Sequence, residues 1–395
     1  MSKLQDLMRE LCPDGVEYKK LGEICKILRG KRLTTKDLVP DGKYPVYHGG
    51  IEPIGYYSTN NRTANSTMII NVGASAGTVG FCSIDFWSSD GCFCFTHNNN
   101  INQRYLFFVL QSMEPSIKSK VRKAGIPTLD NKDVERIILP IPPLEVQNEI
   151  VRILDHFTDL AAEIQAELQA RKEQYEYYRN QLLTFNKIGG GTQSLTWMKM
   201  SEIGTFIRGN GLQKKDFTGS GVPCIHYGQI YTYYGTFATK TKSYISEDTA
   251  KKCKKAHKGD LVIASTSENV EDVGKTVAWL GEEDIAISNH TFIFSHNQNP
   301  KYLSYLFQTK WFAKYKKTKA IGVKVIDIPQ KALEDLCIPI PSFTEQERIV
   351  SILDKFETLV NDLSEGLPAE IAAVQEQYEY YRNKILSFPR IKIGA

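Results

Sequence analysis

The segment LPIPPLEVQNEIVRILDHF, at Leu139–Phe157, recurs in close likeness as IPIPSFTEQERIVSILDKF at Ile338–Phe356. Further along, QYEYYRN at Gln174–Asn180 recurs letter for letter at Gln377–Asn383. The copies are separated by 199 residues for the first pair and by 203 residues for the second. Self-similarity of this kind indicates that one structural unit occurs twice. We therefore predict a tandem duplication.

The duplication extends upstream of these segments. LGEICKILRGK at Leu21–Lys31 resembles MSEIGTFIRGN at Met200–Asn210. The offset between the copies grows from 178 residues near His48 to 199 residues near Asn98, so the second copy carries 21 extra residues. We expect most of them between Tyr231 and Lys258.

Short β-branched and aromatic runs fill the upstream part of each copy. Examples are STMIINVG, TVGFCSI, DLVIAST and KTVAWLG, separated by glycine and asparagine. This pattern is typical of strands and turns, with short helices expected at YLFFVLQSM and YLSYLFQTKWF. We predict an α+β fold with a mainly antiparallel sheet.

The composition is that of a globular protein, with 42% hydrophobic and 24% charged residues among 395. The sequence contains no run of about 18 apolar residues, which a helix would need to cross a bilayer. The first ten residues contain acids and no apolar core, unlike a secretion signal. We expect a cytoplasmic protein with no membrane partner. Eight cysteines occur without a C-x-x-C pair, which favours buried thiols over a metal or redox site.

Positive charge is clustered although the net charge is only +4. From Ile285 to Ile326 there are seven lysines and no acid, and Lys251–Lys258 contains five lysines. A smaller basic cluster lies at Lys118–Lys123. Such clusters are either solvated surface or a binding site for a polyanion, and their presence in both copies favours the polyanion.

A long helical pattern follows each globular part. Apolar residues alternate spacings of four and three from Ile150 to Phe185, interrupted only by Arg171. This seam of about five heptads predicts a coiled coil, and a single amphipathic helix on a core is the alternative. The second copy begins alike at Ile349, but Gly366 and Pro368 predict a break. We expect coiled-coil or partner contacts from Gln147, Ile150, Leu154, Phe157, Ile164, Leu168, Tyr175, Tyr178, Gln346, Ile349, Leu353, Phe356, Tyr378 and Tyr381.

The first helix contains a tandem tetrapeptide, AEIQ at Ala162–Gln165 and AELQ at Ala166–Gln169. It is either a spacer of adjustable length or simply helix-favouring composition. After the helix, Gly189–Gly191 mark a flexible linker. We expect a first globular domain with an N-terminal helix at 1–143, a long helix at 144–185, a linker at 186–194, a second globular domain at 195–342, a second long helix at 343–388 broken near 364–368, and a tail at 389–395.

The matches to catalytic motifs are all incomplete. Val273–Thr276 resembles the end of a phosphate-binding loop, but Asn269 stands where the earlier glycine is needed and a strand pattern follows. Asn71–Gly80 lacks the G-x-G-x-x-G spacing, and Asn299–Tyr302 lacks one proline of the N-P-P-Y signature of amino-methyltransferases. We expect no catalytic or cofactor-binding residue on this chain.

Histidines also give no metal site. The repeated pairs are His48 with His226 and His97 with His296. None has further ligand residues at close spacing, so hydrogen bonding or packing is favoured over metal binding.

Two related domains held apart by a helix can contact two places on one long ligand. Duplex DNA fits, because its repeat of about 34 Å suits such a separation and its phosphates suit lysine clusters. Shared residues are then expected to contact phosphates and unmatched loops to read bases, although ordinary variable surface loops are the alternative. The unmatched loops are Ser58–Arg62, Gly73–Thr78, Tyr231–Lys242 and Ser265–Asn269. We expect DNA contacts from Arg29, Arg62, Ser75, Lys118, Lys120, Arg122, Lys123, Arg208, Tyr231, Lys240, Lys242, Ser267, Asn269, Lys314, Lys316, Lys317 and Lys319.

Four features carry a family resemblance. They are LCPDGVEYKKLGEI at Leu11–Ile24, the P-I-P-x-x-x-x-Q segments ending at Gln147 and Gln346, SEGLPAEI at Ser364–Ile371, and the repeated QYEYYRN. With these motifs, nearly the whole chain resembles the specificity subunit of type I restriction-modification systems.

The resemblance implies two target-recognition domains, two long helices paired as an antiparallel coiled coil, and a pseudo-twofold repeat. It implies recognition of double-stranded DNA as two half-sites separated by unspecified bases. Catalysis would belong to partners: two methyltransferase subunits, which dock on the helices and modify adenine with S-adenosylmethionine, and restriction subunits that use ATP and Mg²⁺. The chain itself would be non-catalytic and hold no cofactor.

Two other functions stay open at this point. A coiled-coil scaffold or adaptor would bind protein but not DNA, and salt-dependent binding to duplex DNA would exclude it. An autonomous DNA methyltransferase would transfer methyl groups by itself, and the missing motifs disfavour it.

Overall fold

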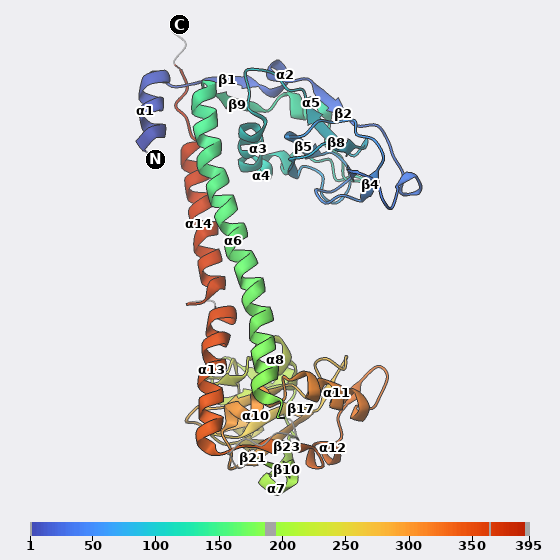
Figure 1. The fold of residues 1–395 in the computed structure, drawn as a ribbon, viewed down its shortest axis with the longest axis vertical. Helices are drawn as coiled ribbons and strands as arrows, with labels where there is room; N and C mark the ends of the chain where they lie inside the picture. The colour runs from blue at the N-terminus through green and yellow to red at the C-terminus, as the bar shows by residue number, and fades with distance from the viewer. Residues whose placement is uncertain (1, 186–194, 363–364, 392–395) are drawn as a thin grey trace. The chain divides into compact units, whose positions relative to one another are not determined.

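The computed structural model describes residues 2–185, 195–362 and 365–391. The chain divides into two compact units, one formed by the residues up to Gln165 and from Glu370, the other by Ala166–Ala369. Each unit combines one globular domain with helical segments from both halves of the sequence (Figure 1). The expected linker at 186–194 lies outside the described residues.

The globular domain of the first unit is built from small sheets and short helices. Its sheets have the strand orders β1-β9, β2-β8-β5-β6 and β4-β3-β7, and β3–β7 is the parallel pair. The strands are β1 (Glu17–Lys20), β2 (Ile27–Arg29), β3 (Tyr44–Tyr47), β4 (Gly55–Tyr57), β5 (Ser66–Ile70), β6 (Val79–Cys82), β7 (Trp87–Ser88), β8 (Cys92–Phe95) and β9 (Ile138–Ile141). The helices are α1 (Ser2–Leu11), α2 (Leu21–Ile24), the 3-10 turn η1 (Thr35–Asp37), α3 (Gln103–Ser112), α4 (Glu114–Ser119) and α5 (Asn131–Glu135).

The globular domain of the second unit repeats this plan with additions. Its sheets have the orders β10-β23, β11-β21-β17-β19-β14, β12-β15-β13-β20-β16 and β18-β22. The strands are β10 (Thr196–Lys199), β11 (Gly204–Arg208), β12 (Phe217–Thr218), β13 (Val222–Ile225), β14 (Phe237–Ala238), β15 (Ser243–Ile245), β16 (Lys254–Ala256), β17 (Leu261–Ala264), β18 (Thr266–Ser267), β19 (Thr276–Trp279), β20 (Ile285–Ile287), β21 (Thr291–His296), β22 (Ile326–Asp327) and β23 (Cys337–Ile340). The helices are α7 (Met200–Ile203), the 3-10 turn η2 (Lys214–Asp216), α8 (Tyr227–Thr232), α9 (Glu247–Ala250), α10 (Pro300–Leu306), α11 (Lys310–Lys319) and α12 (Gln330–Glu334).

The two domains share one strand topology. The order β2-β8-β5-β6 of the first corresponds to β11-β21-β17-β19 of the second, and the parallel pair β3–β7 corresponds to β13–β20. The central strands β5 and β17 are buried along their whole length; β17 is entirely apolar, and β5 also buries Ser66 and Thr67. The duplication and the mixed α+β class are therefore confirmed. The extra strands β14 and β16 lie at sheet ends, within the region where extra residues were expected.

Long helices complete each unit: α6 (Leu144–Leu183), α13 (Phe343–Asn361) and α14 (Leu367–Ile385). In the first unit, α14 runs beside α6 (Figure 1), and the rings of Phe157 and Tyr381 stack at 5.5 Å. Ile150, early in α6, is buried in a cluster with Ile385 at the end of α14. Ala161, later in α6, lines a pocket with Val374, which comes earlier in α14. The two helices are therefore antiparallel in this unit.

The second unit pairs the later part of α6 with α13. Phe356 stacks on Tyr175 and Tyr178, with ring centroids 6.3 and 5.6 Å apart. Ile349, Leu353 and Leu168 are buried, and Ile164, in the first unit, is half-buried. Helix α6 ends at Leu183 rather than at residue 185, and α14 ends at Ile385 rather than at residue 388.

The end of the chain completes the first unit. The amide of Val16 donates to Pro389 O at 2.9 Å, and the amide of Ile391 donates to Val16 O at 3.2 Å. The Tyr18 hydroxyl donates to Phe388 O at 2.8 Å. Residues 389–391, expected to be a tail, therefore pair with the N-terminal part of the chain.

A buried glutamine fixes each long helix to its globular domain. In the first unit, Gln147 Oε1 accepts from the amide of Asn102, and its Nε2 donates to Asn100 O and Pro142 O, at 2.8–3.1 Å. The side chain of Asn102 also caps α3 by accepting from the amides of Arg104 and Tyr105. One amide side chain thereby joins the start of α6 to the start of α3.

The second unit contains the same arrangement. Gln346 Oε1 accepts from the amide of Asn299 at 3.0 Å, and Nε2 donates to Pro341 O at 3.0 Å and to Gln298 Oε1 at 2.8 Å. Gln147 and Gln346 are 0% and 1% exposed. The expectation that they contact a partner is therefore corrected. Both side chains are buried and hydrogen-bonded within their own unit, so a docking subunit could not reach them.

Removing the first glutamine tests this role. In Gln147→Met, a side chain of similar size leaves one buried amide and two carbonyls without partners, so we expect the first unit to lose about 3 kcal/mol of unfolding free energy. Denaturant unfolding followed by circular dichroism measures this. Gln165→Met, at an exposed position of the same helix, is the matched control and should change stability by less than about 0.5 kcal/mol. Equal midpoints for both variants would contradict a structural role.

Candidate nucleic-acid interface

In the first unit, two predicted regions meet at one end of the sheet. The loop at 71–78 follows β5, and Gly73 N donates to Pro127 O at 2.9 Å. A β-bridge joins Val72 to Thr128. Lys118 packs against the same loop, because a Cβ atom at Gly77 would lie 2.9 Å from its Cγ. The loop that contains Ser75 therefore lies beside Lys118 and the segment that ends at Thr128.

The two arginines at the other predicted loop are also neighbours, but only Arg29 is exposed. The guanidinium of Arg62 donates from Nη2 to Arg29 O at 3.0 Å and from Nη1 to Asn61 O at 2.7 Å. Two donors of Arg62 are therefore already used in hydrogen bonds that hold its loop against β2. The counterpart of Arg29 in the second unit, Arg208, ends β11 and is exposed above the ring of Phe292.

In the second unit, β18 pairs with β22 and brings the loop after Thr266 beside the segment after α11. Ser267, expected to contact bases, is 5% exposed within β18. Its hydroxyl accepts weakly from the amide of Asn269 at 3.4 Å. Asn269 in turn donates from Nδ2 to Asp272 at 2.9 Å. Ser267 therefore shapes the loop, which corrects the expectation that it faces a ligand.

Lys316 departs most from expectation. It is 6% exposed, and its Nζ donates to Glu271 O at 2.6 Å and to Val273 O at 3.0 Å. Burial lowers the pKa of Lys316 to about 8. The expected DNA contact is corrected: this ammonium faces inward and anchors the loop at 268–275, because it lies on the inner face of α11. Its neighbours Lys314, Lys317 and Lys319 are exposed.

Aromatic and basic groups from α8 and the following loop lie near this anchor. Tyr231 shares a cavity of about 520 Å³ with Glu271, Lys275 and Lys316. Burial raises the pKa of Tyr231 to about 12. Lys240 and Lys242 are exposed, and the Lys242 ammonium lies 4.4 Å from the ring centroid of Tyr233.

A polar cluster that sequence reasoning missed lies at the same end. Thr266 Oγ1 donates to Asp327 Oδ1 at 3.0 Å and lies 3.1 Å from His290 Nδ1. His290 is exposed with a φ of 63°, and the ring of Tyr227 packs edge-on against it. The buried Asn289 Oδ1 has no hydrogen-bond partner among the described residues. At the repeat offset of 199, His290 aligns with Gly91. This difference between the two copies could have indicated the polar cluster from the sequence.

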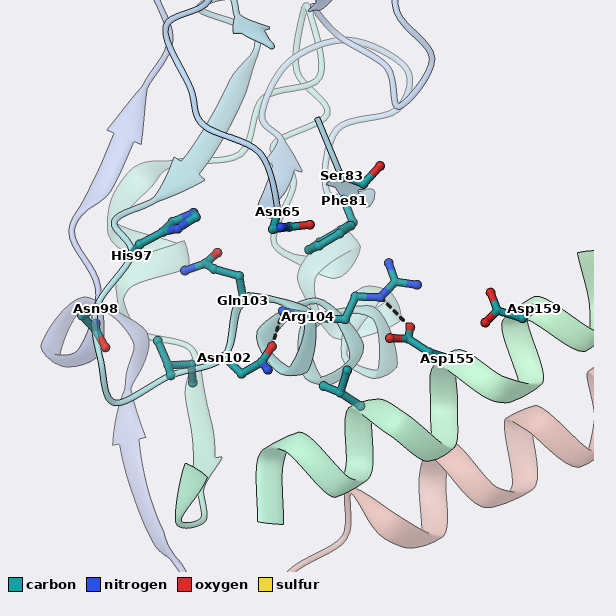
Figure 2. A pocket seen from close by; sticks show the side chains of 12 residues that line it. Asn65, Phe81, Ser83, His97, Asn98, Asn102, Gln103, Arg104, Asp155 and Asp159 are labelled. Atoms are coloured by element: carbon teal, nitrogen blue, oxygen red, sulfur yellow. Dashed lines mark hydrogen bonds and ion pairs between the residues drawn. The ribbon is translucent and has the colours of Figure 1, made fainter. Parts of the chain in front are cut away.

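A separate cavity in the first unit lies where the domain meets α6. It measures about 770 Å³, and Figure 2 shows Asp155 and Asp159 of α6 along one wall. Arg104 Nε donates to Asp155 Oδ1 at 2.7 Å, and its guanidinium carbon lies 4.6 Å from the ring centroid of Phe81. Because the helical wall is acidic and Arg104 is paired, this cavity does not fit a polyanion. The second unit repeats the ion pair as Lys301 with Asp354, also at 2.7 Å.

The repeated histidines serve the fold. His226 Nδ1 accepts from the amide of Gly228 at 3.2 Å, and His296 Nδ1 accepts from the amide of Gln298 at 3.1 Å. His97 Nε2 lies 2.9 Å from Ser66 Oγ. Within residues 2–185, 195–362 and 365–391, no group of three or more His, Cys, Asp or Glu side chains could hold a metal, and no helix is long and apolar enough to span a membrane.

Comparison with known sequences gives a family for both halves of the chain. The model described as type I restriction modification DNA specificity domain matches residues 13–174 and again residues 177–373. The type I restriction enzyme EcoR124I/EcoR124II specificity subunit of Escherichia coli is 30% identical, over 99% of this chain and 98% of that one. The type I restriction enzyme MjaVIII specificity subunit of Methanocaldococcus jannaschii is 25% identical, over 88% of this chain and 87% of that one.

Solved structures show the same fold. The type I restriction-modification S subunit from M. genitalium aligns with a TM-score of 0.58 at 15% identity, covering 94% of this chain and 96% of that one. The HsdS subunit from Thermoanaerobacter tengcongensis aligns with a TM-score of 0.51 at 18% identity, covering 95% and 96%.

Two copies of a DNA specificity domain, each joined to a long helix, define a class of subunit that selects DNA sites for an enzyme. This chain belongs to the type I restriction-modification DNA specificity family. It is the DNA specificity subunit of a type I restriction-modification system, and in this family the specificity subunit is not the catalytic one. The family binds DNA as part of a type I complex.

The inward orientation of Lys316 has a measurable consequence. Its folded-state pKa is about 8 and its ordinary value 10.5, so between these pH values the unfolded chain binds more protons. Wild-type stability should therefore rise with pH across this window relative to Lys316→Met, by up to about 3 kcal/mol. Denaturant unfolding of both proteins from pH 7 to 10.5 measures the difference.

Lys317→Met is the matched control on the same helix. Lys317 is exposed, so the pH dependence of stability should follow wild type. If it contacts a phosphate, the salt dependence of DNA binding should fall by about one counterion. A pH profile of Lys316→Met identical to wild type would contradict the buried-lysine assignment.

Proposed function

We propose that each globular domain is a target-recognition domain that reads one half of a bipartite duplex DNA sequence. The long helices, paired as an antiparallel coiled coil with pseudo-twofold symmetry, would set the number of unread base pairs between the halves. This extends the family assignment to a division of labour within the chain.

One observation carries the proposal: the internal supports of the two domains are the same while their surface loops differ. The shared supports include Gln147 and Gln346, and Tyr105 and Tyr302, whose hydroxyls donate to Pro140 O and Pro339 O at 3.0 and 2.9 Å. The differing surfaces include Arg122 against Ile321, both exposed at the same repeat position. A constant frame with divergent loops is what reading two different sequences demands.

The DNA-contacting set that we propose follows from exposure. It retains the expected residues whose side chains reach solvent and omits Ser267 and Lys316. Arg62 and Asn269 act by shaping their loops, and Ser75 and Tyr231 are half-buried at the edge of the interface. The retained residues, all exposed, are Arg29, Lys118, Lys120, Arg122, Lys123, Arg208, Lys240, Lys242, Lys314, Lys317 and Lys319, and Asn269 is exposed as well.

Partners would supply the chemistry. We propose that two methyltransferase subunits dock on the helical regions and modify adenine with S-adenosylmethionine, and that restriction subunits use ATP and Mg²⁺. The middle tyrosine of each QYEYYRN copy supports such docking: Tyr177 and Tyr380 are both 59% exposed. Their neighbours Tyr175, Tyr178, Tyr378 and Tyr381 instead pack within the helical pairs or against the domain.

Genome-wide mapping of modified adenines tests the function directly. We expect that co-expression of this chain with its methyltransferase subunit leaves one bipartite motif methylated throughout the host DNA. The control is the methyltransferase subunit expressed alone, which should leave DNA unmodified. Association of the two proteins with no DNA binding would instead favour a scaffold, and methylation by this chain alone would make it an autonomous methyltransferase.

The tetrapeptide in α6 gives a sharper test of spacing. Deleting Ala166–Gln169 removes one AELQ unit and shortens the helix by about 6 Å. We expect the unread gap of the motif to shorten while both half-sites stay the same, read out by the same mapping. Replacing the exposed Glu167 and Gln169 by alanine keeps the length and should keep the gap. Altered half-sites with an unaltered gap would refute the spacer.

A further inference from the structure

Two loops that the sequence analysis did not single out expose aliphatic side chains. They are the first tip loop, residues 122–128, and the second tip loop, residues 321–327. Val323 is 93% exposed and Ile126 is 69% exposed, the highest values among the large hydrophobic side chains of the described residues. Ile321 and Val325 are each 59% exposed. A soluble domain gains nothing by itself from presenting such groups to water.

Both tip loops are built in the same way. Arg122 and Thr128 exchange backbone hydrogen bonds of 2.9 and 3.1 Å across the base of the first loop. Ile321 and Asp327 exchange bonds of 2.9 and 2.8 Å across the base of the second. The closed bases lie 199 residues apart at both ends, so Ile126 and Val325 occupy the same position. The exposed aliphatic side chain is thus a repeated feature of a preformed loop.

Backbone geometry holds the second tip loop in this shape. Gly322 has a φ of 109°, and a Cβ atom there would lie 2.0 Å from Val325 O. Only glycine fits this close approach. The first tip loop likewise turns at Gly125, with a φ of 78°. Each loop should lose little conformational entropy on binding, because the hydrogen bonds that close its base are already formed.

The tip loops adjoin the candidate interface. The first is bonded to the loop at 71–78 through Gly73 N and Pro127 O. The second continues into β22, which pairs with β18 at Ser267 and Ile326. Cationic side chains flank each tip. They are Lys120, Arg122 and Lys123 in the first unit and Lys317, Lys319 and Lys324 in the second, all of them exposed.

An apolar tip within a ring of cations fits duplex DNA better than it fits another ligand. The cations can pair with phosphates on either side of a groove, and an aliphatic side chain can then enter between two base pairs. An apolar protein surface would not call for the surrounding lysines and arginine.

We propose that the two tip loops are wedges, each of which unstacks one base step within its half-site. The proposal rests on the proposed function, since it requires each domain to hold DNA. It adds a source of specificity without base-edge hydrogen bonds, because steps that unstack easily, such as pyrimidine–purine steps, accept a wedge at lower cost.

The test uses the complex of this chain with its methyltransferase subunits and a duplex carrying the mapped bipartite site. The fluorescent base 2-aminopurine replaces single adenines in turn, and unstacking raises its emission. With wild type we expect a several-fold rise at one position in each half-site. Val323→Ser with Val325→Ser should abolish the rise in one half-site only, and Ile126→Ser in the other only. Each should weaken specific binding about tenfold.

Matched controls separate a wedge from general damage. Ile84→Ser changes a 55% exposed aliphatic residue elsewhere in the first domain and should change neither emission nor affinity. Lys324→Ala should lower the salt dependence of binding while keeping the emission rise. All these side chains are exposed, so melting temperatures should match wild type.

The outcomes distinguish failure of the wedge proposal from failure of the proposed DNA-recognition function. If the tip-loop variants bind and methylate DNA with wild-type emission, the wedge is overturned and sequence recognition stands. If the variants lose the methyltransferase subunits on purification, the tips are protein-docking surfaces and the wedge is also overturned. If the wild-type complex shows no specific DNA binding at all, the proposed function itself fails.

Discussion

The buried side-chain amide at the start of each long helix is the constraint on which the rest of each unit depends. Gln147 and Gln346 are themselves buried, and each satisfies one amide donor and two acceptors. An amide suits this task because it both donates and accepts in one plane. Around it, the ion pairs Arg104–Asp155 and Lys301–Asp354 join the same helices. Within each unit, these contacts join the globular domain to the start of its helix.

This anchoring explains how one frame can carry two different surfaces. The supports lie inside, where a substitution leaves unpaired polar groups and costs stability. At one loop that differs, Arg122 of the first domain corresponds to Ile321 of the second, and both residues make the same pair of backbone hydrogen bonds across the loop base. Even the added strands β14 and β16 attach at sheet ends.

Charge near the candidate interface divides into two kinds. Exposed lysines such as Lys317 stay solvated and can exchange water for phosphate at little cost. Lys316 is buried, and its ammonium group donates hydrogen bonds to two backbone carbonyls. The loop that it anchors is part of the candidate interface, so in the proposed function this lysine would contribute by holding that loop in place.

The sequence by itself determined the duplication, the α+β class, the long helical segments and the family, because each is written in local pattern: repeated motifs, β-branched runs and heptad spacing. It could not tell Lys316 from Lys317, since one residue along a helix changes the direction of a side chain by about 100° and only the packed neighbours define which direction is inside. It also could not show that Gln147 and Gln346 face a capped helix across the domain, or that Ile126 and Val325 stand at equivalent exposed tips. Those relations join residues far apart in the chain, and only the tertiary structure, which decides what each side chain faces, brings them together.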